Sequence, residues 1–337
     1  MDILQTLYNE IIGFLGVSQV WEILKTGNYS SFTTYDGIVA LIYPIIPLLI
    51  LLEFILGLVY KKPQTKVYKV NFLIYIFNRF IGRFIAIAMV VLIIGALQSY
   101  ALFQTKMTWY WFIYGYIIWE FGHFIYHYLG HKVRLFWCLH STHHAPEEMN
   151  LSVTHAHFFL EAPYADTIRT TVCILLGVDP ALLFLIMFID GTYGAFIHVG
   201  ENLMKNGRMG FLNKIILTPS HHRVHHAKNP LYMDTNFCNL LNIWDKLFGT
   251  YQNEEADIAI EYGITREINS GNFLDVYFGE FVALFKDIAR APGLKNKLLY
   301  TVMPPGWSHT GEHQTAKIVR NAHLQQNVPS QKKVAKV

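Results

Sequence analysis

Histidines are crowded into three short segments of this 337-residue chain. The segments read HYLGH, HSTHH and HHRVHH and cover residues 127–131, 140–144 and 221–226. Imidazole nitrogens are common ligands of zinc, copper, iron and nickel. The repeated HxxxH and HxxHH spacing favours metal binding over isolated structural histidines. By contrast, we interpret three histidines of the tail as ordinary residues, namely His309, His313 and His323.

The spacing within the segments indicates how metal ions could be shared. His127 and His131 are four residues apart near the end of an expected helix, so both lie on one face of it. In each HxxHH segment, we expect the i, i+3 pair to share a helical face and the adjacent histidine to serve a second ion. One ion needs about three or four protein ligands. This many imidazoles therefore indicates two neighbouring ions.

Other catalytic motifs fit the sequence less well. There is no HExxH motif of zinc proteases, and no GxGxxG, Walker or GxSxG loop. The ExxH of ferritin-like di-iron bundles occurs once, at Glu120 and His123, whereas those bundles need it twice. A net charge of +3 without a basic run argues against nucleic-acid binding. Zinc would suggest hydrolysis and iron would suggest oxygen activation, and the ligands alone leave both open.

The composition points to a membrane protein. Hydrophobic residues make up 53% of the chain and charged residues 15%, and the mean hydropathy is +0.27, whereas soluble domains have about 25% charged residues. A helix needs about 20 apolar residues to span a bilayer. We expect four spans, the last interrupted by the sequence GVDP, at residues 37–60, 84–103, 108–130 and 171–197.

Basic residues between the first two expected spans indicate a cytoplasmic loop. Alternation from that loop places all three histidine segments at the cytoplasmic face. Glu53 and Asp190 are among the few charged residues inside the expected spans. A carboxylate at such a depth is a functional candidate, and the alternative for Glu53 is a hydrogen bond that packs helices.

We therefore predict an all-α integral membrane protein with about four transmembrane helices. A cytoplasmic helical cap would carry the histidine-rich dinuclear metal site. Residues 1–36 are expected to form an amphipathic segment, residues 37–310 the membrane-embedded domain with its cap, and residues 311–337 a polar, disordered tail. Within the cap, residues 272–289 have the apolar spacing of a packed or interfacial helix.

The order and spacing of the histidine segments resemble the fatty acid hydroxylase and sterol desaturase superfamily. The resemblance extends over about residues 35–310 and is most specific between EFGHFIYHYLGH and NIWDKLFGTY. Within the superfamily, IHVGENL, TPSHHRVHH and NIWDKLFGTY are most similar to the alkylglycerol monooxygenase branch and its bacterial relatives. Tyr128 departs from the pattern, because relatives often have arginine there.

The resemblance implies a membrane oxygenase that holds two iron ions, with O2 as co-substrate. Zinc could replace the iron during purification. The implied metal ligands are His127, His131, His140, His143, His144, His198, His222, His225 and His226. The residues expected beside them, where they would orient the imidazoles, are His123, His157, Asp234 and Asn236. The roles of His155 and His221 are left open.

The implied reaction is hydroxylation of an unactivated C–H bond of a lipid, in particular the cleavage of an ether lipid. A sterol or fatty-acid desaturase or hydroxylase, a zinc-dependent membrane hydrolase and a non-enzymatic metal-binding membrane protein remain alternatives. The expected partners are a lipid from the bilayer and an electron donor, either a protein or a small reductant such as a pterin. The resemblance to bacterial sequences favours a bacterial inner membrane over an endoplasmic reticulum, and the oligomeric state is left open.

Overall fold

The computed structural model describes residues 18–28, 44–60, 64–81 and 83–326, together with a few single positions before residue 63. Within these residues the fold is all-α, as predicted, and no β-strand is formed. Extended contacts are limited there to isolated bridges that join Ile216 with Leu241 and Ala227 with Tyr262.

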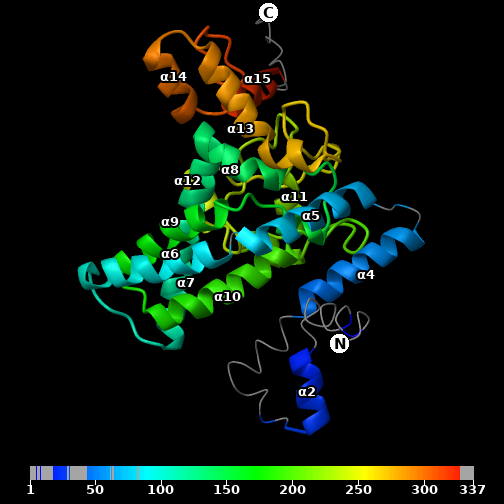
Figure 1. The fold of residues 1–337 in the computed structure, drawn as a ribbon, viewed down its shortest axis with the longest axis vertical. Coiled ribbons are helices and arrows are strands. Elements are labelled where there is room, and N and C mark those ends of the chain that lie inside the picture. Colours follow the sequence, from blue (N-terminus) through cyan, green and yellow to red (C-terminus); the bar gives the residue numbers. More distant parts are fainter. Residues whose placement is uncertain are drawn as a thin grey trace, which may run out of the picture.

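The long helices are α4 (Ile45–Val59), α5 (Thr65–Ile81), α6 (Arg83–Leu97), α7 (Trp109–Lys132), α9 (Glu161–Leu175), α10 (Pro180–Phe196) and α13 (Phe273–Arg290). The shorter α-helices are α2 (Ser18–Thr26), α8 (Arg134–His144), α11 (Pro219–His225), α12 (Ile243–Phe248), α14 (Gly293–Val302) and α15 (Ala316–Gln326). Short 3-10 helices are η2 (Gln98–Tyr100), η3 (Leu151–His155) and η4 (Gly210–Lys214). Figure 1 shows α4, α6, α7, α9 and α10 in one half of the molecule, α13–α15 at the opposite end, and α8, α11 and α12 between them.

The half of the molecule with the long helices is built around the packing of α7 against α9 and α10. Its core consists of Tyr116, Trp119, Cys173, Ile174, Val178, Leu182, Leu183 and Ile186. Helices α7 and α9 approach closely because α7 has a glycine at position 122, where a Cβ atom would lie 3.0 Å from Arg169 Cα. This contact fixes the later turns of α7, which carry the first histidine segment.

The predicted membrane spans do not appear as long apolar helices. Among the described residues, no helix combines the length and the apolar character needed to cross a bilayer. Helices α4 and α6 have 15 residues each, or about 22 Å, and residues 37–43 lie outside the described part of the chain. The 171–197 segment is split into α9 and α10 near GVDP, because Asp179 caps the first turn of α10 through two backbone amides. Helix α7 has 24 residues, but polar side chains such as Glu120 interrupt its apolar sequence.

Glu53 on α4 serves helix packing. Its carboxylate accepts hydrogen bonds from the backbone amides of Leu151 and Gly200, both at 2.7 Å, and from the Tyr68 hydroxyl at 3.0 Å. These contacts support the alternative interpretation of Glu53 given above, in which its carboxylate forms hydrogen bonds that pack helices. Glu53 ties α4 to the two loops that follow the second histidine segment and His198.

The two ends of the chain differ in part from the predictions. Of the predicted amphipathic segment 1–36, residues 18–26 form α2, and most of the remainder lies outside the described residues. Of the predicted disordered tail 311–337, residues 316–326 form α15. Arg320 of α15 donates hydrogen bonds to Met233 O (3.3 Å) and Gln252 Oε1 (3.1 Å), so polar contacts hold this helix in place. Residues 327–337 lie outside the described part.

Candidate metal centre

The structure brings the nine predicted ligand histidines together in two adjacent groups. The first group, here called the five-histidine group, consists of His127, His131, His140, His144 and His225. The second, the four-histidine group, consists of His143, His198, His222 and His226. Within each group the candidate ligand nitrogens all lie within 4.8 Å of one another, and all nine residues are buried. The groups adjoin where the rings of His144 and His226 stack, with centroids 4.4 Å apart.

Helices α8 and α11 each contribute to both groups. On α8, His140 and His144 belong to the five-histidine group and His143 to the four-histidine group. At α11, His222 and His226 belong to the four-histidine group and His225 to the five-histidine group. This allocation corrects the predicted one, because the i, i+4 pair shares a group and the i+3 residue joins the other. An α-helix turns by about 100° per residue, so residues four apart differ by about 40°, whereas residues three apart differ by about 60° in the opposite direction.

The hydrogen bonds at the outer ring nitrogens assign the tautomers in the five-histidine group. His127 Nδ1 donates to Phe237 O (2.8 Å), and His140 Nδ1 donates to Glu161 Oε1 (2.5 Å). In a neutral ring, Nε2 then carries a lone pair, and these two Nε2 atoms are 3.0 Å apart. Two lone pairs at this distance repel each other unless a cation lies between them. Ligands about 2.1 Å from one ion, at angles of about 90–110°, would be about 3.0–3.4 Å apart.

Burial favours the neutral form of His131 and His198. Desolvation lowers the pKa of His131 to about 4 and that of His198 to about 3. Neutral imidazole is the form that binds metals. The Nε2 atoms of His131 and His225 are buried and have no hydrogen-bond partner among the described residues. Since an unsatisfied buried nitrogen costs about 1–3 kcal/mol, these residues fit a metal ion, which would supply the missing partner.

The four-histidine group has the same chemistry. His198 Nδ1 donates to Gly194 O (2.6 Å), while its Nε2 lies 3.1 Å from His143 Nε2 and 2.9 Å from His222 Nε2. His226 Nε2 lies 3.1 Å from His222 Nε2. His198, which the resemblance alone suggested, thus lies between imidazoles of the second and third segments.

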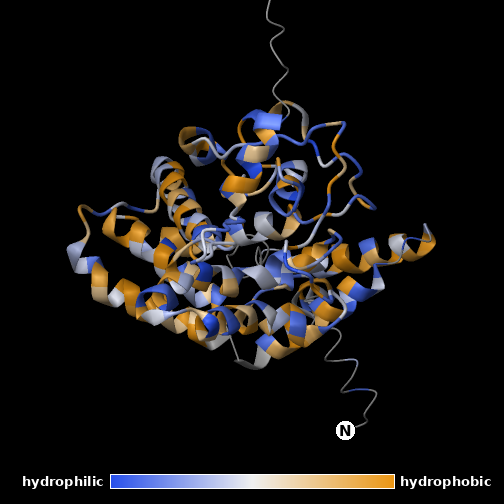
Figure 2. Cartoon of the chain, turned by 90° about the horizontal axis from the view of Figure 1, so that it is seen from above, coloured by the Kyte–Doolittle hydropathy of each residue, from blue (hydrophilic) through white to orange (hydrophobic). Residues whose placement is uncertain are grey.

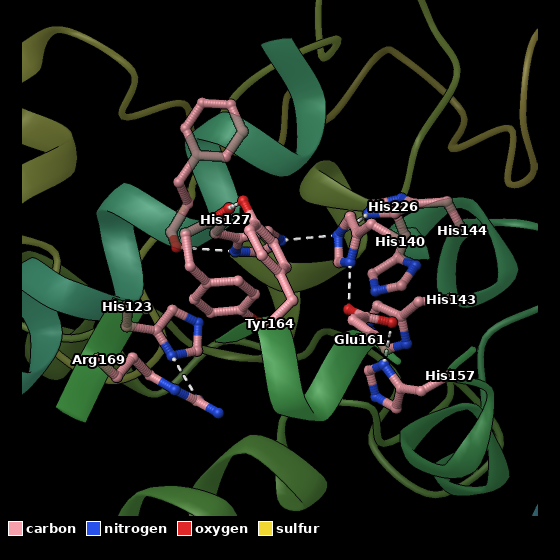
Figure 3. A network of polar contacts seen from close by, with 12 residues as sticks. His123, His127, His140, His143, His144, His157, Glu161, Tyr164, Arg169 and His226 are labelled. Atoms are coloured by element: carbon pink, nitrogen blue, oxygen red, sulfur yellow. Dashed lines mark hydrogen bonds and ion pairs between the residues drawn. The ribbon is translucent and has the colours of Figure 1, made fainter. Parts of the chain in front are cut away.

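Glu161, at the start of α9, connects the surroundings of both groups. Figure 3 shows its carboxylate between His140 and His157, and the His157 Nδ1···Glu161 Oε2 distance is 2.8 Å. The His157 ring stacks on His143 with centroids 4.2 Å apart, so His157 lies beside a member of the four-histidine group. Burial alone would raise the pKa of Glu161, but His157 and His140 lower it to about 2. No sequence motif marked Glu161, and its one signal is a carboxylate four residues after a histidine.

Two further predicted residues flank the five-histidine group. Asp234 Oδ1 lies 3.3 Å from His131 Nδ1. Burial raises the pKa of Asp234, but the contacts with His131 and Lys132 together outweigh burial and lower it, so the carboxylate is charged. His123 packs edge-on against His127, with centroids 5.6 Å apart, and its Nδ1 faces Arg169 at 3.5 Å (Figure 3). Both residues are adjacent to ligand rings, and neither belongs to a group.

Asn236 and His221 support the backbone of α11. Asn236 Nδ2 donates to His221 O (3.0 Å), and its Oδ1 accepts from Gln252 N (2.8 Å). Asn236 therefore positions the helix, whereas the sequence predicted that it orients an imidazole. The reason is its left-handed backbone, with φ of 57°, which places the amide between these two chain segments. His221 Nδ1 accepts from Thr218 N (3.1 Å) and caps the helix, so it lies outside both groups.

Two buried carboxylates hold the loop that follows Asn236. Asp245 accepts a hydrogen bond from Phe237 N (2.7 Å), and Glu120 of α7 accepts one from Leu240 N (2.6 Å). The Phe237 carbonyl is the acceptor for His127, so this loop orients a ring of the five-histidine group. Glu120, the acid of the single ExxH motif, thus acts on backbone amides.

A cavity of about 370 Å³ opens onto the five-histidine group. Its wall includes His131, His144 and His225 but no member of the four-histidine group. Residues 304–305 and 314–317 complete the wall. Sites for small molecules are about 300–1,000 Å³ in volume, so a substrate of moderate size could reach the five-histidine group from this side.

A second cavity of about 380 Å³ lies among α4, η3 and α10. Ile46, Met187 and Phe188 give it a largely apolar wall. His155 also lines this cavity. This histidine therefore lies apart from both groups.

Residues 112–250 match the family model described as fatty acid hydroxylase. This segment contains all nine histidines of the two groups, and it is a fatty acid hydroxylase domain. The resemblance noted in the sequence is thus confirmed at the level of the family.

Curated relatives include both animal and bacterial enzymes. Human alkylglycerol monooxygenase is 32% identical over 214 residues, which cover 62% of this chain and 46% of the human protein. Alkylglycerol monooxygenase of Caenorhabditis elegans is 30% identical over 241 residues, or 68% of this chain and 46% of the relative. Ornithine lipid hydroxylase OlsE of Rhizobium tropici is 31% identical over 158 residues, which cover 47% of this chain and 46% of the relative. The alignments thus span less than half the length of these relatives, and no solved structure matches the chain.

Proposed function

We propose that this protein is a membrane-bound oxygenase that hydroxylates a C–H bond of a lipid. The observation that carries the proposal is the pair of adjacent histidine groups, in which Nε2 lone pairs face each other at 3.0 Å. The fatty acid hydroxylase domain supports oxidation over hydrolysis. The relatives support it too, because their names describe monooxygenases and a hydroxylase.

We assign one iron ion to each histidine group. Iron bound by imidazoles supplies the oxygen activation that amino-acid side chains cannot provide. The residues of this chain would hold and orient the ions: Glu161 and Asp234 fix imidazole rings from outside. Zinc binds the same nitrogens, usually more tightly than ferrous iron. A purified sample that contains zinc would therefore not contradict the assignment.

Each hydroxylation consumes one O2 and two electrons. One oxygen atom is inserted into the C–H bond to give an alcohol, and the other leaves as water with two protons. The electrons come from an external donor, either a protein or a small reductant such as a pterin. When the hydroxylated carbon adjoins an ether oxygen, the product is a hemiacetal, which breaks into a fatty aldehyde and a glycerol. The relatives named alkylglycerol monooxygenase make this ether-lipid reaction our first choice.

We place the long helices other than α13 in a bilayer, from which the lipid would enter. Figure 2 shows hydrophobic residues along much of the length of these helices. Many of their apolar side chains are exposed, including Leu48, Leu51, Ile55 and Leu58 on α4, Phe72 and Leu73 on α5, and Ile87, Val91 and Leu92 on α6. An apolar surface of this kind is typical of membrane contact. The metal centre would lie at the cytoplasmic boundary, and a bacterial inner membrane is our proposal for its location.

The alternatives predict different products. A desaturase would give a lipid with a new double bond, and a sterol or fatty-acid hydroxylase would give a stable alcohol. A zinc hydrolase would act without O2. A metal-binding or transport protein would bind ions and alter no lipid.

The test is product analysis with the iron-loaded full chain in lipid nanodiscs, an alkylglycerol, O2 and a reductant. We expect a fatty aldehyde whose formation requires O2 and is abolished in His144→Ala. His309→Ala is the matched control, because His309 contacts Tyr300 and lies outside both groups. A stable alcohol as product would indicate a lipid hydroxylase, and an alkene would indicate a desaturase. No O2-dependent product with any lipid tested would refute it.

A further inference from the structure

The cavity beside the five-histidine group has a wall of mixed origin. One side comes from the first and third histidine segments, through residues such as Tyr128 and His225. The other side comes from the C-terminal part of the chain, which lies outside the fatty acid hydroxylase domain and contributes residues 304–305 and 314–317. The chemistry of this cavity therefore depends on residues that the family match does not cover.

The charges on the cavity wall are unequal. Apart from histidines, its charged residues are Lys132, Lys228, Lys317 and Asp234. Asp234 forms an ion pair with Lys132 and also contacts the neutral ring of His131, so its negative charge is already balanced by Lys132. No ion pair between Lys228 or Lys317 and a carboxylate is found among the described residues. Within the described part of the chain, the cavity wall therefore has two lysines without a carboxylate as ion-pair partner.

The remaining wall is apolar enough to hold the start of an alkyl chain. Trp137, Met233, Ile264 and the adjacent Pro304 and Pro305 all line the cavity. A ligand that matches this wall has a negatively charged head and an apolar portion. Lysine ammonium groups are strongly hydrated point charges, which suit phosphate groups.

We propose that this cavity binds the phosphate group on the head of a lipid, with Lys228 and Lys317 as its partners. This inference rests on the proposed function and narrows its substrate class. The carbon next to an ether oxygen is only a few bonds from the glycerol head, so a site that oxidises this carbon must hold the head close to the metals. The cavity lies at that place, because His131, His144 and His225 form part of its wall. Lys317 makes the C-terminal segment part of substrate recognition.

The experiment measures equilibrium binding by calorimetry to the purified, metal-loaded full chain in the absence of reductant. Three probes are compared: a short-chain 1-O-alkylglycerol 3-phosphate, the uncharged alkylglycerol with the same chain, and inorganic phosphate. The variants are Lys228→Gln, Lys317→Gln and the double variant. Lys295→Gln is the matched control, because Lys295 is exposed on α14 and does not line the cavity.

We expect the wild type to bind the phosphorylated lipid at least about tenfold more tightly than the uncharged one. Each single variant should weaken binding of the phosphorylated lipid about three- to tenfold, as for partly exposed charge pairs. The double variant should bind the two lipids about equally, and Lys295→Gln should behave as the wild type.

Equal binding of the two lipids by the wild type would overturn the inference, as would a preference that survives in the double variant. Inorganic phosphate that binds as tightly as the phosphorylated lipid would identify a site for the free ion and overturn the lipid assignment. These outcomes are independent of turnover. An enzyme that oxidises alkylglycerol without such a preference would keep the proposed function and refute only this inference.

Discussion

His225 and His226 are neighbours in the chain, but they belong to groups of different size. Replacing His225 with alanine leaves four imidazoles in its group, whereas replacing His226 leaves three. Four nitrogens complete a tetrahedral site, so we expect His225→Ala to keep more metal than His226→Ala. The measurement is metal content per chain by mass spectrometry after dialysis against a chelator. Equal losses in the two variants would show that the groups do not bind ions separately.

Glu161 contacts the imidazoles of His140 and His157 with its two carboxylate oxygens. Since outer carboxylates fix ligand orientation, we expect Glu161→Gln to weaken metal binding about 10- to 100-fold. Competition with a coloured chelator measures this affinity directly. Glu267→Gln, at an exposed position outside the site, is the control and should bind metal as the wild type does. Unchanged affinity in Glu161→Gln would mean that this carboxylate only packs α9.

The histidines could be predicted from the sequence, because their spacing is a local property of the chain and their resemblance to a family is specific. Their outer partners could not. Glu120 accepts a hydrogen bond from the backbone amide of Asn239, which is 119 residues away in the sequence. Glu161 accepts one from His140, which is 21 residues away. Such contacts depend on how helices pack, which no local pattern encodes. The predicted assignment of histidines to the two groups within each HxxHH segment was wrong for a smaller reason. Around the helix axis, an i+4 neighbour is about 20° closer in direction than an i+3 neighbour.

At the scale of elements, the contact between α7 and α9 positions the first histidine segment. Gly122→Ala would place a Cβ atom 3.0 Å from Arg169 Cα, so the helices must separate slightly. We expect a loss of about 1–3 kcal/mol in the free energy of unfolding, as for other overpacked sites. Gly191→Ala on α10 is the control, since its Cβ meets no atom within 4 Å, and it should gain up to about 1 kcal/mol from helix propensity. Thermal unfolding of both variants decides the question, and equal melting temperatures would contradict tight α7–α9 packing.

The all-α class and the break near GVDP were predictable at this scale, because Asp179 and Pro180 form a recognisable helix start. The lengths of the helices were less predictable. Apolar composition indicates which segments become helices, but capping contacts determine where they end. The tail illustrates the same limit, since polar sequence suggested disorder while Arg320 secures α15 through contacts with residues far away in the chain.

At the scale of the whole molecule, the candidate metal centre joins long helices of one half to the short helices between the two ends. Helices α7, α8 and α11 and the end of α10 converge on nitrogens that repel one another without a cation. We expect removal of metal by a chelator to lower the melting temperature, since an ion at about 100 times its dissociation constant stabilises the fold by about 2.7 kcal/mol. Adding iron back should restore the melting temperature. A chelator that leaves it unchanged would indicate that the centre forms without an ion.

Because α8 and α11 each serve both groups, the spacing between the two candidate ion sites depends in part on the spacing of histidines within each of these two segments. Within each of these two segments, the number of residues between the histidines fixes their directions around the helix axis. Ser141 and Thr142 separate the histidines of one segment, and Arg223 and Val224 those of the other, so a substitution at these positions keeps the spacing of the histidines. One inserted or deleted residue would turn the following histidines by about 100° around the helix axis. Both candidate ion sites would then lose ligands at once. Length variation in such a protein is therefore confined to the chain outside these two segments.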